Sequence, residues 1–300
     1  MATKLLPRIK KGLWLYIMFL PTLIMVFLFN YLPIPGIRFA FFRYNVFTAP
    51  IFVGWWNFER LFSSQRFWSV FRNTLELSLG NLFIGMICAI GIALLLNEIS
   101  RLIMKRTIQT IIYLPHFMSW VVVASIWHII LAPQGGFVNN VLTGLGIIDR
   151  PIFFIADERW WRPWFFFVNR WKATGWGTII YLAALTGINP ELYESSAIDG
   201  AGRLKQTWYI TLPCIAPTII IVLVLNLASV LNLFESVLVM YNPAVYSVAD
   251  VIQTYNFRIG LIESDYGYST AVGLFRSIIC MFLVLGANKV SKRVRGRGIL

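Results

Sequence analysis

Side chains that could carry chemistry are sparse in this apolar chain and occur in two settings. One is the polar interruption 189–213, in which Glu194-Ser-Ser-Ala-Ile-Asp-Gly200 precedes Ile210-Thr-Leu-Pro213. The other is a scatter of amides, hydroxyls and charges inside hydrophobic runs. Neither setting contains a nucleophile constellation, a metal-ligand cluster or a glycine-rich phosphate loop with a lysine. The sequence therefore predicts no catalytic residue and no metal site, and any ATP hydrolysis must occur on another chain.

The first half of the polar interruption has the signals of a short, well-capped helix. Asn189 can cap it, and Pro190 fits the first turn, where a missing N–H costs nothing. Glu191 and Glu194 place negative charge near the positive end of the helix dipole. Gly200 can adopt the left-handed conformation that ends a helix.

A second short helix is predicted over 203–211, ending at Pro213 because proline cannot comfortably continue a helix. Two capped helices joined at a glycine corner form a compact polar element between two hydrophobic runs. A membrane protein that keeps such an element between spans is expected to use it for contact with something in the water.

Composition places the whole chain in a membrane. Of its 300 residues, 58% are hydrophobic and only 13% are charged. Several apolar runs reach the roughly 20 residues that a helix needs to cross a bilayer. We therefore predict an all-α polytopic membrane protein with six transmembrane helices, near 13–32, 75–96, 108–131, 164–188, 215–240 and 271–288.

Lysine and arginine in the connecting segments give the orientation of these spans. The side with both termini and the 189–213 interruption holds fourteen, and the opposite side holds nine. By the positive-inside rule, both termini and the interruption are cytoplasmic. The net charge of +13 is explained by basic residues that flank spans near anionic headgroups, so no nucleic-acid partner is predicted.

The fifth predicted span has a polar face. At about 100° per residue, its polar residues fall within one half of the helix circumference; they are Asn226, Ser229, Asn232, Glu235 and Ser236. Such a face suits a translocation pathway, and the alternative is hydrogen bonding between helices. Arg276 in the last span could pair with Glu235 or with Glu76, and the sequence leaves that choice open.

Two cations open the fourth predicted span. Arg170 and Lys172, with Trp176 nearby, could attract acidic sugars while the aromatic rings stack on sugar faces. The alternative, which the sequence favours, extends both cationic side chains to the external headgroups. We count Arg170, Lys172 and Trp176, together with Tyr181, as candidate pathway residues.

The 189–213 interruption resembles a known motif. Glu194-Ser-Ser, Gly200 and Ile210-Thr-Leu-Pro213 are similar in spacing to the coupling loop of ABC importer permeases of binding-protein-dependent systems, which usually begins Glu-Ala-Ala. Serines replace both alanines here, a change between small residues. Asp199 before Gly200 resembles the carbohydrate branch of that family.

The resemblance covers nearly the whole chain, from about Trp14 to the C-terminus. Tyr113-Leu-Pro-His-Phe-Met-Ser-Trp120, Tyr181-Leu-Ala-Ala-Leu-Thr-Gly187 and Val239-Met-Tyr-Asn-Pro243 look like oligosaccharide permeases of the maltose type. Within these, the likeness is to permeases for complex-polysaccharide fragments, including alginate-like or other uronate oligosaccharides. The implied fold is the type I ABC importer permease fold, with a cytoplasmic coupling helix in a bacterial inner membrane.

The resemblance also implies partners. These are a second permease subunit in a heterodimer, two ATPase subunits that bind ATP and Mg, an extracytoplasmic solute-binding protein and an oligosaccharide substrate. This chain itself would bind no cofactor. The residues implied to contact an ATPase groove are Glu191, Glu194, Ser195, Ser196, Ala197, Asp199, Gly200 and Ala201.

Three regions are expected along the chain: an N-terminal span with the first external loop over 1–70, the transmembrane domain over 71–290, and a basic cytoplasmic tail over 291–300. The rival functions are an integral-membrane enzyme, a secondary transporter, a receptor or scaffold, and an ABC permease for a non-sugar solute. A secondary transporter would typically show paired broken helices in repeated halves, and no such repeat is evident. His116 and His128 fit core or interfacial roles better than a proton relay.

Overall fold

The computed structural model describes residues 13–45 and 47–295. The lysines and arginine of 1–12, used above for orientation, and the last five residues of the predicted tail lie outside these ranges. The chain divides into two compact units, one made of Met1–Leu61 with Ile259–Leu274, and the other of Phe62–Arg258 with Phe275–Leu300.

The first unit begins with helix α2, Leu13–Val26, followed by η2, Phe27–Tyr31, and η3, Ile34–Phe41. No side chain of α2 is buried by the rest of the chain, as expected for an apolar membrane helix. Strands β1, Phe42–Asn45, and β2, Thr48–Phe52, pair antiparallel. Helix α3, Trp56–Ser63, follows, and its buried Asn57 donates to the carbonyls of Ala40 (2.8 Å) and Phe42 (3.0 Å). The π-turn η7, Arg258–Ile262, leads to α15, Tyr266–Arg295, whose first residues complete this unit.

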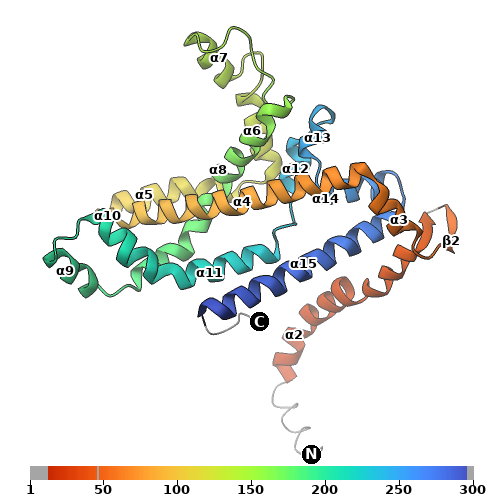
Figure 1. Cartoon of the computed structure of the whole chain (residues 1–300), viewed down its shortest axis with the longest axis horizontal. Helices are drawn as coiled ribbons and strands as arrows, with labels where there is room; N and C mark the ends of the chain where they lie inside the picture. Colours follow the sequence, from red (N-terminus) through yellow and green to blue (C-terminus); the bar gives the residue numbers. More distant parts are fainter. Residues whose placement is uncertain (1–12, 46, 296–300) are drawn as a thin grey trace, which may run out of the picture. The chain divides into compact units, whose positions relative to one another are not determined.

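The second unit contains the long helices α4, α8 and α11 and several short ones (Figure 1). Its elements are α4 Gln65–Asn97, α5 Leu102–Tyr113, η4 Leu114–Phe117, α6 Trp120–Ile130, α7 Phe137–Gly144, α8 Glu158–Thr186, α9 Glu191–Ile198, α10 Arg203–Gln206, η5 Thr207–Thr211, α11 Leu212–Ala228, α12 Glu235–Met240, η6 Pro243–Val245, α13 Tyr246–Ala249, α14 Ile252–Phe257 and the part of α15 from Phe275 onward.

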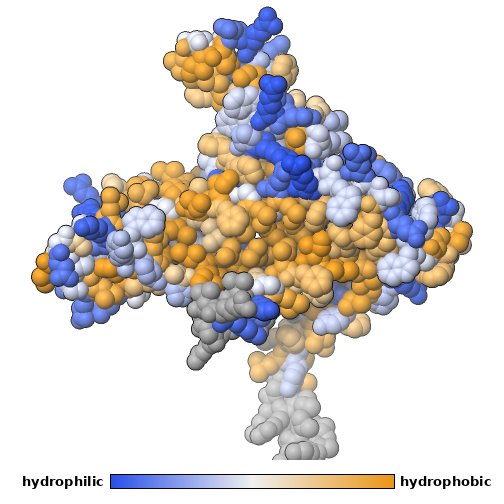
Figure 2. Space-filling model, viewed as in Figure 1, coloured by the Kyte–Doolittle hydropathy of each residue, from blue (hydrophilic) through white to orange (hydrophobic). Residues whose placement is uncertain are grey.

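Four helical segments within the described residues are long and apolar enough to cross a membrane: Leu13–Phe41, Gln65–Asn97, Arg203–Leu227 and Tyr266–Lys289. The bent pair formed by Leu102–Phe117 and Trp120–Ile130 gives a fifth if it is counted as one span. The predicted fourth span lies in the 29-residue helix α8, which is not among these candidates. The protein is therefore mostly helical, with four to five candidate spans. Figure 2 shows hydrophobic side chains along α11, with hydrophilic ones gathered around α9 and α10.

The third predicted span is not one straight helix. Its two halves meet at an angle of 102°. Pro115 lies in the first turn of η4 and has no N–H with which to continue α5. Ser119 then caps α6, because its Oγ accepts a hydrogen bond from the Val122 N–H at 3.3 Å. The span predicted near 108–131 is therefore a bent pair of helices and not one straight helix.

The fifth predicted span is also interrupted. Helix α11 ends at Ala228, residues 229–234 are not helical, and α12 begins at Glu235. Amide and hydroxyl side chains can hydrogen-bond to nearby backbone and compete with the helix. Ser229 does so here, donating to the Asn226 carbonyl at 3.3 Å. The five polar residues of 226–236 therefore do not form one face of one helix, which corrects the prediction.

Pro213 does not end a helix. The segment Arg203–Leu227 is continuous through it, and the turn before it, η5, is a π-turn in which the Leu212 N–H donates to the Thr207 carbonyl. The wider turn accommodates a proline that cannot donate to the fourth residue before it. The predicted stop at Pro213 is thus replaced by a local widening.

Helices α4 and α8 form the most extensive helix pair of the second unit. One buried cluster includes Leu77, Val123, Trp161 and Phe165 and joins α4, α6, α8 and α12. A second includes Ala89, Ala93, Tyr181, Leu185 and Ile215 and joins α4, α8 and α11. These two clusters fix α8 between its neighbours, so its polar residues have defined positions.

Gly175 allows α5 and α8 to approach closely. A Cβ at this position would overlap the backbone carbonyl of Ile112, which cannot move aside as a side-chain tip could. We expect Gly175→Ala to lower the free energy of unfolding of the permease by about 1–3 kcal/mol. The check is the fraction of detergent-solubilised protein that stays monodisperse on heating, which should be smaller for the variant. Gly91→Ala, where a Cβ meets nothing within 4 Å, is the control. Equal behaviour of the two variants would contradict this packing.

Candidate functional site

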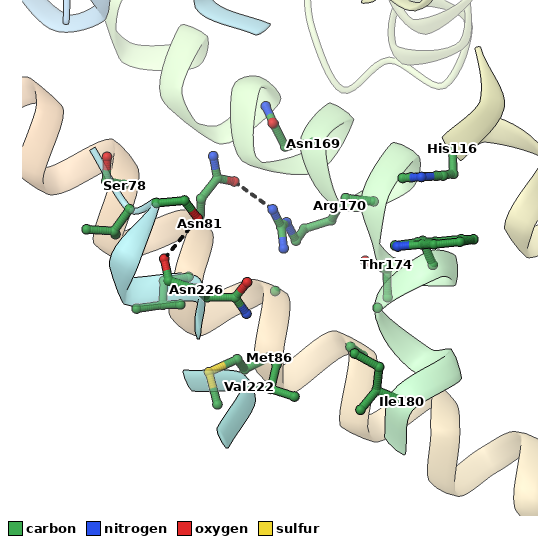
Figure 3. A pocket seen from close by; sticks show the side chains of 18 of the residues that line it. Ser78, Asn81, Met86, His116, Asn169, Arg170, Thr174, Ile180, Val222 and Asn226 are labelled. Atoms are coloured by element: carbon green, nitrogen blue, oxygen red, sulfur yellow. Dashed lines mark hydrogen bonds between the residues drawn. The ribbon is translucent and has the colours of Figure 1, made fainter. Parts of the chain in front are cut away.

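A cavity of about 430 Å³ lies between α4, α8 and α11 (Figure 3). This volume is within the range of small-molecule sites, about 300–1,000 Å³. Its walls combine apolar residues such as Leu82, Met86, Ile180 and Val222 with polar and aromatic ones. The polar and aromatic lining residues are Ser78, Asn81, His116, Asn169, Arg170, Thr174, Trp176, Tyr181, Asn226 and Ser229.

Arg170 is the central cation of the cavity. In Figure 3 its guanidinium points from α8 toward α4, where Nη2 donates to Asn81 Oδ1 at 2.9 Å. Its Nε is buried and has no hydrogen-bond partner among the described residues. The predicted extension of Arg170 to external headgroups is therefore wrong, because the side chain turns inward to an amide on the neighbouring helix.

Three lining hydroxyls share this unpaired state. Ser78 Oγ, Thr174 Oγ1 and Tyr181 OH are buried without a hydrogen-bond partner within the described part of the chain. An unpaired buried polar group is costly, so it is usually explained by water or by a ligand. Hydroxyls that both donate and accept are the groups that recognise sugar hydroxyls.

The cavity also has an aromatic wall. The rings of His116 and Trp176 are stacked with centroids 4.7 Å apart and planes within 4°. About half of the Trp176 surface is exposed. An exposed indole face beside hydrogen-bonding groups can pack against the apolar face of a sugar ring.

Lys172 lies away from the cavity lining. Its side chain is buried, and its Nζ donates to the backbone carbonyls of His116 (2.8 Å) and Met118 (2.7 Å) and lies 5.4 Å from the centre of the Trp120 ring. These carbonyls belong to the break between α5 and α6. The predicted extension of Lys172 to headgroups is wrong, since the ammonium instead satisfies backbone oxygens that the break leaves without helical partners.

The polar residues beyond Ser229 do not line this cavity. Asn232 Oδ1 accepts from Gln253 (3.1 Å) and from Arg276 (3.0 Å). Glu235 is exposed at the start of α12, and Ser236 is buried. Arg276 thus donates to Asn232, and among the described residues it forms no ion pair with Glu235 or Glu76.

Glu76 instead contacts Arg72 (2.7 Å) and Arg162. Arg162 also donates to Asn73 Oδ1 at 2.8 Å, and Asn73 Nδ2 donates to the carbonyls of Ser247 and Asp250. This network fastens the segment around α13 to α4 and α8.

Sequence reasoning missed Ser78, Asn81, Asn169 and Thr174 in the cavity. The usable signal was spacing within the long apolar helices: Ser78 and Asn81 are three residues apart, and Arg170 and Thr174 are four apart, so each pair lies on one helix face. Of the residues that were predicted, the structure brings together Arg170, Trp176, Tyr181, Asn226 and Ser229.

The second candidate site is α9 with its flanking turns. Asn189 Oδ1 accepts from the Glu191 N–H at 3.1 Å, and Pro190 precedes α9 with a helical φ of −57°. At the other end Gly200 has φ +76°, and the Ala201 N–H donates to the Ser196 carbonyl at 2.9 Å. The predicted caps are confirmed, and this exit from the helix requires the left-handed conformation that favours glycine.

Side-chain hydrogen bonds tie α9 to the helix that follows. Gln206 Nε2 donates to Ser196 Oγ at 3.0 Å, and the hydroxyls of Tyr193 and Thr211 lie 2.9 Å apart. The outer surface is left free, because Glu191, Glu194, Ser195, Ala197, Asp199 and Gly200 are all exposed. Ile198 is 88% exposed and adds an apolar point to that surface.

In the described part of the chain, no group of three or more His, Cys, Asp or Glu residues is placed so that it could hold a metal ion. The two sites therefore offer a polar and aromatic cavity with one central cation, and an exposed, rigidly capped helix.

Comparisons with known proteins agree with this arrangement. Residues 81–296 match the model of the family described as "Binding-protein-dependent transport system inner membrane component". The chain is 40% identical over 300 residues to the polygalacturonan/rhamnogalacturonan transport system permease protein YteP of Bacillus subtilis, covering 99% of this chain and 93% of YteP. It is also 40% identical over 295 residues to protein LplB of Bacillus subtilis, covering 97% and 92% of the two chains.

A solved structure is similar over the same length. One chain of a bacterial alginate ABC transporter, in complex with an alginate pentasaccharide-bound periplasmic protein, superposes with a TM-score of 0.88 and 40% identity, covering 98% of this chain and 99% of that one. The fold is accordingly the type I ABC importer permease fold. The chain belongs to the family of binding-protein-dependent transport system inner membrane components and is a non-catalytic, multi-pass permease subunit of an ABC importer.

Proposed function

We propose that this permease passes oligosaccharides, including acidic polysaccharide fragments, from a solute-binding protein into the cytoplasm. The observation that carries the proposal is the 40% identity, over almost the full length, to relatives named for polygalacturonan and alginate transport. The cavity supports it, because hydroxyls, amides, a guanidinium and an exposed indole are the groups that bind charged sugars.

The proposed pathway runs through the cavity past Arg170, Trp176, Tyr181, Asn226 and Ser229. Beyond it, the non-helical segment 229–234 offers backbone groups and the amide of Asn232. Glu235 and Ser236 continue the polar route from this break into α12. Lys172 does not line the pathway, but its ammonium positions the lining residue His116 by donating to its backbone carbonyl.

The proposed topology has six membrane crossings, with α8 as the sixth segment beside the four to five candidates found by length and hydropathy. Both termini, including the basic tail 291–300, and the turn that carries α9 lie in the cytoplasm. The positive-inside count of the sequence supports this orientation. The transmembrane domain extends over 71–290, and the first external loop precedes it within 1–70.

The proposed assembly is a heterodimer of this chain with a second permease, two ATPase subunits that bind ATP and Mg, and an external solute-binding protein. Helix α9 would insert into a groove of one ATPase. The contact residues are Glu191, Glu194, Ser195, Ala197, Asp199, Gly200 and Ala201, whereas Ser196 tethers α9 through Gln206. Since α10, η5 and α11 form one continuous helix, a displacement of α9 would reach the cavity wall at Asn226.

The assembled transporter should import uronate oligosaccharides in preference to neutral ones. In proteoliposomes that hold both permeases, the ATPases and the binding protein, we expect uptake of labelled trigalacturonate to exceed that of neutral trisaccharides by at least about ten-fold, because one charge-assisted contact is worth that much. Preference for the neutral sugars would overturn the acidic assignment. Uptake of neither class, with a non-sugar solute carried instead, would overturn the oligosaccharide assignment.

A further inference from the structure

Arg170 is a positive charge without a compensating carboxylate in the cavity. The lining residues include no aspartate or glutamate, and no ion pair among the described residues involves Arg170. A guanidinium is protonated at all physiological pH values. A buried charge is ordinarily paired with an opposite charge, so this cavity is electrostatically prepared for an anion.

Gly85 makes room for that charge. A Cβ at position 85 of α4 would overlap Arg170 Nη1, whereas a Cβ at Gly91 on the same helix meets nothing within 4 Å. The guanidinium therefore lies against bare backbone, and Asn81, one turn earlier on α4, fixes its Nη2 by a 2.9 Å hydrogen bond. Gly85 and Asn81 together determine where the cation lies.

A second nitrogen of the guanidinium and two of the lining hydroxyls have no hydrogen-bond partner within the described residues. These atoms are Arg170 Nε, Ser78 Oγ and Thr174 Oγ1, and all three are buried without a partner in the part of the chain that the structure describes. Ser78 is 2% and Thr174 6% exposed. A carboxylate is an acceptor-only group with two oxygens, and it can be bound by a guanidinium and hydroxyls together.

We infer that Arg170, placed by Gly85 and Asn81, is a subsite for one carboxylate of the transported oligosaccharide, and that Gly85 is a specificity-determining residue although it carries no functional group. This inference rests on the proposed function and deepens it. It assigns the discrimination between acidic and neutral sugars to the guanidinium of Arg170. Neutral sugars of the same size can accept hydrogen bonds from the cation but form no ion pair with it.

The test uses the complete transporter in nanodiscs without the binding protein, so that binding to the permeases is measured directly. The probes are trigalacturonate and its carboxyl-reduced counterpart, trigalactose of the same linkage. We expect Arg170→Gln to weaken trigalacturonate binding roughly ten- to a hundred-fold while trigalactose binding changes less than about three-fold. Gly85→Ala should weaken trigalacturonate binding several-fold by displacing the guanidinium, and Gly91→Ala should change neither probe.

Equal loss of both probes in Arg170→Gln would overturn the subsite and leave Arg170 as a link between α4 and α8. Unchanged trigalacturonate binding in both Arg170→Gln and Gly85→Ala would overturn it as well. Gly85→Ala keeps the charge and displaces only a flexible tip, so it reports on the subsite even if Arg170→Gln does not assemble. The proposed function fails separately, if the wild-type transporter imports no oligosaccharide when its binding protein is present.

Discussion

Replacing Gly200 with proline should remove most of the ATPase activity that substrate-loaded binding protein stimulates in the assembled transporter. Proline fixes φ near −65°, and Gly200 requires φ +76°. The substitution also removes the N–H that donates to the Ala197 carbonyl at 3.1 Å. The exit from α9 would change direction, and α9 would no longer present its outer surface to the ATPase that we propose binds it. We expect stimulation to fall at least about ten-fold, measured as phosphate release from proteoliposomes, with membrane insertion unaffected.

Two further variants separate a local defect from a general one. Glu194→Lys leaves the backbone intact but reverses an exposed charge near the N-terminus of α9, so it should also lower stimulation. Gly202→Ala is the matched control, because Gly202 has a negative φ (−72°) and a Cβ there meets nothing within 4 Å. Normal stimulation in Gly200→Pro would be incompatible with coupling through α9.

The second large effect is expected at a buried ion pair of the segment after α13. The side chains of Asp250 and Arg258 are 2% and 13% exposed and form an ion pair. Burial lowers the pKa of Arg258, but the hydrogen bond and charge of Asp250, together with the charges of Tyr241 and Tyr246, outweigh it, so that pKa lies above its ordinary value. Asp250→Asn would leave a buried guanidinium without its counter-charge. We expect the free energy of unfolding to fall by about 3–5 kcal/mol, measured by thermal denaturation of the purified permease.

An exposed ion pair provides the comparison. Arg203 and Glu98 lie 3.3 Å apart, with 85% and 54% of their side chains exposed. Solvent screens such a pair, so Glu98→Gln should change stability by less than about 1 kcal/mol. If Asp250→Asn proved as mild as Glu98→Gln, the Asp250–Arg258 pair would not hold this segment in place.

Local signals in the sequence predicted local structure well. The helix at 190–200 was correctly placed because Asn189, Pro190 and Gly200 act through atoms a few residues away. Apolar runs likewise predicted the long helices α4, α11 and α15. Even the wrong stop at Pro213 came from a sound local rule, which the π-turn before it circumvents.

Features that depend on distant partners were not predictable in the same way. The break at Pro115 is supported by Lys172, whose Nζ donates to carbonyls more than fifty residues away in sequence. Arg170 turns inward because Asn81, on another helix, accepts its hydrogen bond. The sequence shows that two cations, Arg170 and Lys172, lie near the start of a predicted span. It does not show which groups on neighbouring helices determine where their side chains point.

The length of the continuous helix that contains the π-turn Thr207–Thr211 determines how far its end moves when the helix tilts. Its 25 residues, from Arg203 to Leu227, correspond to a rod about 37 Å long at 1.5 Å per residue. If such a rod pivots at its α10 end, a tilt of about 5° displaces the far end by about 3 Å, roughly the length of one hydrogen bond. The far end is followed at once by the non-helical residues 229–234, which can absorb the displacement. A small tilt of this helix is therefore enough to make or break contacts at Asn226.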